Sequence, residues 1–335
     1  MGTQHTARKI HLGLGYPDFV IQVHVWEEPD WFDEFAGSLG SVARCSKGKE
    51  IPASTEVLVK GSPSKEEIAS LSNLTSVVVP FAGIPAGTRE LLLDQPKISL
   101  YNLHHNSADT AEMAIALYMA AAKRIVPRDR DLREGKWSSD SFLRYGSSDS
   151  VRADGKQALV LGYGAIGQRI GRVCEAMGMT VTGVRRSGPF SDQVRSITEL
   201  DQLLPKAEAL FIALPLTPET KGLLNKERIG MLPANCIVSN IGRGAIIEEE
   251  PFFEALKSNR ILAAGLDVWW KYPDGSDAPC YPSNFSFHEL PNVVMTPHVG
   301  GSSDASEAHR WRALSELVMA IASGSARAAS VQEGY

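Results

Sequence analysis

Cysteine is scarce in this sequence, and no two cysteines stand at a metal-binding spacing. The 335 residues include 4 cysteines, Cys45, Cys174, Cys236 and Cys280, and none belongs to a C-x-x-C pair. Zinc sites and dithiol redox motifs are built from such pairs. We therefore expect no metal site, and we interpret the cysteines as small buried side chains in a reducing compartment.

Long apolar runs and an excess of positive charge are also missing. The N-terminal residues lack the apolar core of a signal peptide, and the longest apolar stretch, residues 113–122, is about half of a membrane span. The formal net charge is -5 and no basic patch stands out, whereas nucleic-acid-binding proteins usually carry one. We expect a cytoplasmic protein whose partners are neither membranes nor nucleic acids.

The composition is that of a globular protein with room for two cores. Hydrophobic residues make up 43% and charged residues 22% of the chain, and this length suggests roughly two domains. Strand and helix patterns alternate in the first part, which favours a parallel sheet. Ser64 and Glu67 form a capping-box pattern. The expected elements are strands at 56–60, 77–79 and 98–102 and helices at 65–71 and 90–93, while the strand-like pattern at 11–25 has no assigned partner.

A helix rich in alanine, residues 107–124, separates this series from a second one. Small side chains suit either a core helix or a helix at a subunit interface. The charged residues 128–133 are interpreted as a solvated face. The second series predicts strands at 157–161, 180–184, 210–214, 237–240, 263–268 and 293–296 and helices at 165–177, 226–231, 251–258 and 305–321. Two such series predict an α/β protein with two doubly wound domains.

A glycine-rich motif follows the strand at 157–161 and opens a helix. Its residues are Gly162, Tyr163, Gly164, Ala165, Ile166 and Gly167, in the pattern G-x-G-x-x-G. In this context the first glycine permits a tight turn, the second admits a pyrophosphate and the third allows close packing of helix and strand. The helix N-terminus attracts phosphate. The motif therefore predicts a dinucleotide site.

The next strand ends without the acidic residue that is typical of NAD sites. Arg185, Arg186 and Ser187 stand there instead. Guanidinium groups bind a 2′-phosphate, which a carboxylate would repel. We therefore expect NADP as the cofactor, with NAD as the second choice; the alternative is that one or both arginines face solvent.

Several ordered motifs make the chain resemble the D-isomer-specific 2-hydroxyacid dehydrogenase family. They cover most of the sequence from about Val57 to the last helix and are found at residues 106–112, 135–137, 155–157, 240–244, 265–268 and 296–301. The resemblance implies two Rossmann-like domains. Residues 1–103, completed by 300–335, would be a flavodoxin-like substrate domain, into which a dinucleotide-binding domain at 104–299 is inserted.

The resemblance also implies the site residues. Arg243, just after a predicted strand, would clamp the substrate carboxylate and carbonyl. His298 would be the general acid for reduction and the base for oxidation. The backbone of Phe81, Ala82 and Gly83 would bind the substrate carboxylate. Asp267 would lie near the nicotinamide or have a structural role. The remaining cofactor-site assignments are Leu214, Pro215, Ile241, Gly242 and Gly300.

One position departs from the family pattern. Tyr272 occupies the place of a glutamate that usually supports the histidine. We include Tyr272 among the catalytic candidates because its hydroxyl can orient an imidazole, although a neutral group would not raise the imidazole pKa. Asp274, Asp277 and Glu289 are alternative partners. We expect a pKa of His298 below that of members with glutamate. The aromatic segment with Trp269, Trp270, Tyr272 and Tyr281 lines a pocket or packs between domains.

These observations predict an oxidoreductase that moves a hydride between NADP(H) and a small 2-oxo or 2-hydroxy acid. The favoured activity is reduction of a 2-oxo acid of the glyoxylate or hydroxypyruvate type, by a homodimer. The alternatives are a nicotinamide-binding sensor or regulatory protein, and a dehydrogenase of another substrate such as formate.

Overall fold

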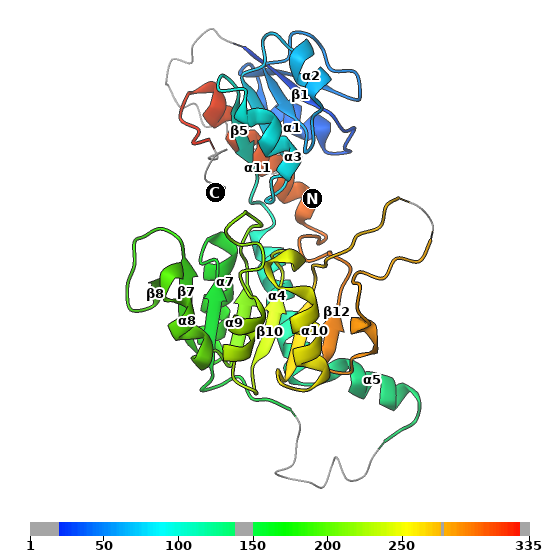
Figure 1. Cartoon of the computed structure of the whole chain (residues 1–335). Helices are drawn as coiled ribbons and strands as arrows, with labels where there is room; N and C mark the ends of the chain where they lie inside the picture. The colour runs from blue at the N-terminus through cyan, green and yellow to red at the C-terminus, as the bar shows by residue number, and fades with distance from the viewer. Residues whose placement is uncertain (1–19, 138–149, 276–277, 329–335) are drawn as a thin grey trace, which may run out of the picture. The chain divides into compact units, whose positions relative to one another are not determined.

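The computed structural model describes residues 20–137, 150–275 and 278–328 (Figure 1). These residues form two compact units. Unit 1 contains 20–80, 84–103 and 311–328, and unit 2 contains 81–83 and 104–310. None of the helices in the described ranges is both long and apolar enough to span a membrane.

Unit 1 is built on a parallel sheet with the strand order β2-β1-β3-β4-β5. Strand β1 pairs with β2 on one side and β3 on the other, so the order reverses beside β1. This order is the flavodoxin-like one. The bounds are β1 Ile21–Val25, α1 Phe32–Leu39, β2 Ala43–Lys47, β3 Val57–Val59, α2 Lys65–Ser70, β4 Ser76–Val79, α3 Ala86–Leu93 and β5 Ser99–Asn102.

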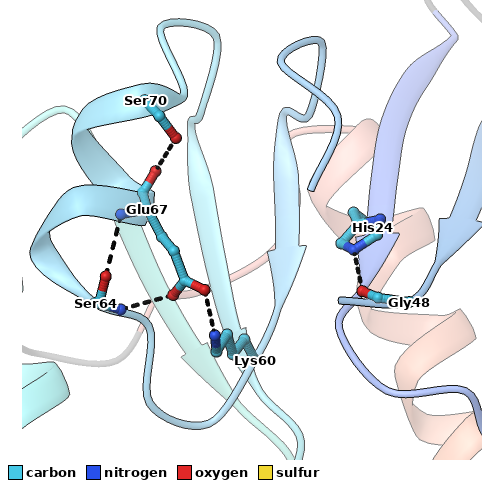
Figure 2. A network of polar contacts seen from close by, with 6 residues as sticks. All are labelled: His24, Gly48, Lys60, Ser64, Glu67 and Ser70. Carbon is cyan, nitrogen blue, oxygen red and sulfur yellow. Dashed lines mark hydrogen bonds and ion pairs between the residues drawn. The ribbon is translucent and has the colours of Figure 1, made fainter. Parts of the chain in front are cut away.

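Local signals explain some elements of unit 1. The predicted capping box of α2 is confirmed: Ser64 Oγ accepts from the N–H of Glu67 at 3.2 Å, and the Glu67 carboxylate accepts from the N–H of Ser64 at 2.8 Å (Figure 2). Glu67 also binds Lys60, which follows β3 (Figure 2). The sequence patterns did not identify α1 and β2, because α1 lacks a side-chain cap and β2 buries only Ala43.

The open question of the N-terminal strand is answered for the described part of the chain. Residues 21–25 form β1, beside the switch in strand order, while 11–19 lie outside the described residues. His24 on β1 is fully buried, and its Nε2–H donates to the Gly48 carbonyl at 2.8 Å (Figure 2). Burial lowers the pKa of His24, which suits a neutral core imidazole. Leu314 and Val318 complete this core from helix α11, Ser306–Ala322.

Unit 2 contains a parallel sheet of order β12-β11-β10-β9-β6-β7-β8. Here the strand order reverses at β6, which pairs with β7 and β9. The fold class predicted from the sequence is thus confirmed. The bounds are α4 Ser107–Ala122, α5 Ile125–Arg133, β6 Gln157–Leu161, α7 Ala165–Ala176, β7 Thr180–Arg185, β8 Val194–Ser196, α8 Leu200–Leu203, β9 Ala209–Ile212, α9 Lys226–Met231, β10 Ile237–Asn240, α10 Glu249–Lys257, β11 Ala263–Leu266 and β12 Val293–Met295.

The alanine-rich helix α4 packs on this sheet. Its small residues are buried in the core, among them Ala111, Ala114 and Ala121. A Cβ on Gly265 of β11 would lie 2.7 Å from Leu117 Cβ, so helix and strand approach closely. The helix ends two residues earlier than expected, because Arg124 adopts a left-handed φ of 51° and a separate exposed helix, α5, begins after it.

Candidate functional site

The glycine loop lies where the strand order of unit 2 reverses, at the carboxyl end of β6. In open α/β sheets this is the place where ligands bind. Gly162 has a φ of 93°, and a Cβ there would lie 2.6 Å from the Ala213 carbonyl oxygen after β9. A Cβ on Gly167 would meet the Gly162 carbonyl and lie 3.2 Å from Val160 Cγ1. A Cβ on Gly164 would meet nothing within 4 Å. The loop is therefore tight against the protein at two glycines and open at the third, which fits a pyrophosphate.

Tyr163, between the first two glycines, covers the helix and strand that follow the loop. Its ring occupies the space beside Gly183 on β7 and Gly171 on α7, so that a Cβ at either position would clash with it. The Tyr163 carbonyl accepts from Arg185 Nη2 at 3.1 Å. The glycine loop and the arginine pair are thus joined by a direct contact.

A cavity of about 390 Å³ lies beside the loop. It brings together eight of the residues that the sequence assigned to the cofactor: Gly162, Tyr163, Gly164, Arg185, Arg186, Ser187, Leu214 and Pro215. The lining also includes Thr217, Glu219 and Thr220, which the motifs did not identify. Their signal was their place after β9, since loops at the carboxyl ends of strands beside the switch point face the ligand.

The other cofactor assignments do not line this cavity. Ile241 is buried in the core and its N–H donates to the Ile212 carbonyl at 3.2 Å, while a Cβ on Gly242 would lie 2.6 Å from the Leu214 carbonyl. Leu214 also falls beyond the end of β9, which stops at Ile212 rather than at residue 214. These residues shape the backbone of the loops that follow β9 and β10.

Arg243 follows β10, as the sequence predicted. Its Nη1 donates to the Gly242 carbonyl at 2.7 Å, and Asn240 Nδ2 donates to the Arg243 carbonyl at 3.1 Å. The guanidinium lies against Gly83, where a Cβ would clash with it. Glycine at position 83 is thus what allows the predicted substrate loop, Phe81–Gly83, to approach the arginine.

Asp267 fixes the loop that carries His298. The carboxylate is 2% exposed, and Oδ1 accepts from Thr296 Oγ1 at 2.6 Å and from the Val299 N–H at 2.9 Å. Oδ2 accepts from the Gly300 N–H at 2.8 Å. Between these anchors His298 has a φ of 57°, a left-handed conformation that non-glycine residues adopt only when the surroundings impose it. Asp267 therefore holds the Thr296 side chain before the histidine and the backbone after it.

Tyr272 lies beside His298 but does not hydrogen-bond to it. The two ring centroids are 5.5 Å apart, and the Tyr272 hydroxyl accepts from the Trp269 N–H at 3.2 Å. The expectation that this hydroxyl orients the imidazole is therefore not met by the geometry, because the hydroxyl is directed to the backbone. Tyr272 is 47% exposed.

The rest of the aromatic segment packs elsewhere. The indole N–H groups of Trp269 and Trp270 donate to the carbonyls of Thr296 and Ile247 at 2.8 and 2.9 Å. The Tyr281 ring stacks on His288, with centroids 4.3 Å apart. The two tryptophans thus pack within unit 2, at its hydrophobic core.

The pKa of His298 lies below its ordinary value. Desolvation by burial is the main cause, the Arg243 guanidinium acts in the same direction and the Asp267 carboxylate opposes both. Neither Asp274 nor Glu289 is among the charges that act on the imidazole, and Asp277 lies outside the described residues. The neighbouring carboxylate is thus Asp267, and its oxygens accept hydrogen bonds from the loop rather than from the ring.

Within the described parts of the chain, no group of three or more histidine, cysteine, aspartate or glutamate side chains is arranged to hold a metal ion. The acid–base and cationic groups at the site are the imidazole of His298 and the guanidinium of Arg243. The imidazole can exchange a proton and the guanidinium can bind an anion.

Two doubly wound sheets and a glycine loop at a switch point define a dinucleotide-binding protein of the Rossmann class. The model of the D-isomer specific 2-hydroxyacid dehydrogenase NAD-binding domain matches residues 115–300. The chain belongs to this family, as the sequence motifs predicted. The matched residues lie within unit 2.

Two curated relatives match part of this chain in sequence. A D-3-phosphoglycerate dehydrogenase of Archaeoglobus fulgidus is 32% identical over 225 residues, which is 65% of this chain and 40% of that protein. A hydroxypyruvate reductase of Blautia hydrogenotrophica is 31% identical over 197 residues, 58% of this chain and 59% of that protein. The matches thus span between two fifths and three fifths of these relatives.

A solved structure extends the likeness to both units as a fold. The NADPH-dependent glyoxylate/hydroxypyruvate reductase of Sinorhizobium meliloti, in complex with NADP and sulfate, has a TM-score of 0.74 and 21% sequence identity. The alignment covers 94% of this chain and 99% of that one.

Proposed function

We propose that this protein is an NADP(H)-dependent reductase of small 2-oxo acids of the glyoxylate or hydroxypyruvate type. The observation that carries the proposal is the combination of the arginine pair at the dinucleotide cavity with Arg243 and His298 after the strands of the same sheet. A curated relative named hydroxypyruvate reductase supports the substrate class. NAD is the second choice of cofactor.

The dinucleotide would be held by the glycine loop and the cavity beside it. The N–H groups at the start of α7 would bind the pyrophosphate. Arg185, Arg186 and Ser187 line the cavity at the carboxyl end of β7, and they would bind the 2′-phosphate of the cofactor. When bound, the reduced cofactor supplies the hydride. Its place at the switch point is the one that open sheets of this kind use.

The reaction needs an anchored carboxylate and a proton at the carbonyl oxygen. Arg243 would bind the carboxylate, since its planar guanidinium offers two parallel donors. The backbone at Phe81–Gly83, which the guanidinium contacts at Gly83, would add N–H donors. His298 in its imidazolium form would donate a proton to the oxygen as the hydride reaches the carbon.

The domain roles and the assembly are part of this proposal. Unit 2 would be the dinucleotide-binding domain, and unit 1 the substrate domain. A homodimer is supported by apolar side chains left exposed on and after α5, namely Ile125, Leu132 and Trp137, the last of which is 74% exposed. A cytoplasmic location is part of the same proposal.

The test is oxidation of NADPH and NADH with a panel of 2-oxo acids from glyoxylate to phenylpyruvate. We expect turnover with NADPH, reduced about 100-fold or more in His298→Ala and unchanged in His288→Ala, whose imidazole stacks on Tyr281. Tight NADPH binding without turnover on any 2-oxo acid would overturn the proposal and favour a nicotinamide-binding sensor.

A further inference from the structure

The surroundings of the His298 imidazole do not favour its charged form. Among the described residues, the side chains that act on it or pack beside it are Arg243 after β10, Asp267 after β11, and Tyr272 in the loop that follows. Arg243 is a cation, and Tyr272 is directed to a backbone N–H. The Asp267 carboxylate accepts three hydrogen bonds from the histidine loop. In the described residues, no carboxylate hydrogen-bonds to the ring.

This arrangement limits the reduction of a carbonyl group. When a hydride reaches the carbon of a C=O bond, the electron pair moves to oxygen, which must take a proton. The imidazolium form of His298 would be the donor. An unperturbed imidazole is already mostly neutral above about pH 7. Burial and the nearby Arg243 guanidinium lower the pKa of His298 further, and no carboxylate of the described residues hydrogen-bonds to the ring, so the imidazolium form is disfavoured there.

A protonated carbon–nitrogen double bond makes no such demand. A hydride from NADPH adds to the carbon of an iminium group, and the electron pair of the C=N bond becomes the lone pair of the amine. The cation is neutralised and NADP⁺ is released, so no proton is transferred in the hydride step. The amine later takes a proton from water. The reaction therefore needs no reductant other than NADPH, the cofactor of the proposed function.

We infer that the site also reduces 2-imino acids in their iminium form, and that it prefers them to 2-oxo acids above neutral pH. The substrate would bring a carboxylate for Arg243 and an N–H donor beside His298. A neutral imidazole accepts a hydrogen bond from such a donor, whereas an imidazolium would repel it. The same neutral ring that is a poor acid for a carbonyl is thus a suitable neighbour for an iminium.

This inference rests on the proposed function, and a pH profile separates the two. The rates of reduction of a cyclic 2-imino acid and of a 2-oxo acid by NADPH would each be measured from about pH 6 to about pH 9. Each rate would be calculated for the concentration of the iminium or carbonyl form present at that pH. The kcat/KM for the 2-oxo acid should fall about tenfold per pH unit above the pKa of His298, while that for the iminium should not fall.

A pair of variants sharpens the test. Tyr272→Glu adds a carboxylate beside the imidazole, and Tyr272→Gln adds a neutral side chain of the same shape. At about pH 8 we expect the ratio of 2-oxo acid to iminium reduction to be about tenfold higher in the glutamate variant than in the glutamine variant, since a charged neighbour raises the imidazole pKa by about one unit or more.

The outcomes are distinct. Equal ratios in the two variants, or parallel pH profiles for the two substrates, would overturn the inference and leave the 2-oxo acid reductase intact. Failure to reduce the 2-oxo acid at any pH would overturn the proposed function itself, whereas failure to reduce the iminium alone would overturn only the inference.

Discussion

The two halves of the candidate site in unit 2 are fixed in different ways. The glycine loop after β6 takes its conformation from its own glycines, because a Cβ on Gly162 or Gly167 would clash with neighbouring backbone. The His298 loop takes its shape from Asp267, some thirty residues earlier, which accepts three hydrogen bonds from it. The glycine loop can thus be recognised as a sequence motif, whereas the conformation of the His298 loop depends on a carboxylate that is distant in the sequence.

The largest effect should come from replacing Asp267, whose carboxylate holds the His298 loop. In Asp267→Asn the side chain keeps one acceptor oxygen, and its NH2 group would face a backbone N–H, so the left-handed conformation of His298 loses part of its support. We expect kcat for 2-oxo acid reduction to fall about 100-fold, with NADPH affinity changed only slightly. Steady-state kinetics and a binding titration check this.

Asp201→Asn is a matched control, since that carboxylate pairs with Arg228 far along the chain from the histidine loop. Should Asp267→Asn weaken NADPH binding and leave kcat intact, Asp267 would serve the cofactor rather than the histidine.

The glycine loop offers a matched pair of substitutions. Gly167→Ala places a Cβ against the Gly162 carbonyl, and we expect a loss of about 1–3 kcal/mol in the free energy of unfolding. Gly164→Ala places a Cβ in open space, so stability should hold while NADPH affinity falls. Thermal melts with and without NADPH distinguish the two. Equal destabilisation by both would contradict the different roles given to these glycines.

The arginine pair should have an effect of about tenfold on cofactor choice. We expect the double variant Arg185→Ala, Arg186→Ala to raise the Kd of NADPH about tenfold or more while the Kd of NADH changes little, because only NADPH carries the 2′-phosphate. Arg169→Ala, on the exposed side of α7, is the control. An unchanged ratio of the two Kd values would show that these arginines do not read the phosphate.

The smallest effect should be confined to unit 1. Ser64→Ala removes the hydroxyl that accepts from the Glu67 N–H at the start of α2, and we expect a loss of about 1 kcal/mol in stability. NADPH affinity should not change. Chemical denaturation followed together with NADPH binding checks both statements, and a large change in affinity would show that the two units do not respond separately.

The same contrast explains how far the sequence could be interpreted. The strand and helix alternation, the capping box at Ser64 and the glycine loop depend on local patterns, and they were predicted. The short helix α1 and the polar strand β2 carry weak local signals and were not.

In the site, the positions of Arg243 and His298 after strands were predictable. The hydrogen bonds of Asp267, and the direction of the Tyr272 hydroxyl toward Trp269, depend on how the chain folds back on itself. That Tyr272 departs from the family pattern stays a prediction, and its geometry beside the imidazole needed the structure.

The most direct test of the account is transfer of deuterium from NADPH labelled at the reactive nicotinamide carbon to glyoxylate or hydroxypyruvate. We predict that the label appears on the carbon that carried the oxo group, that NADPH supports transfer better than NADH, and that His298→Ala nearly abolishes it. Binding of NADPH with no label in any 2-oxo or 2-imino acid would contradict the account.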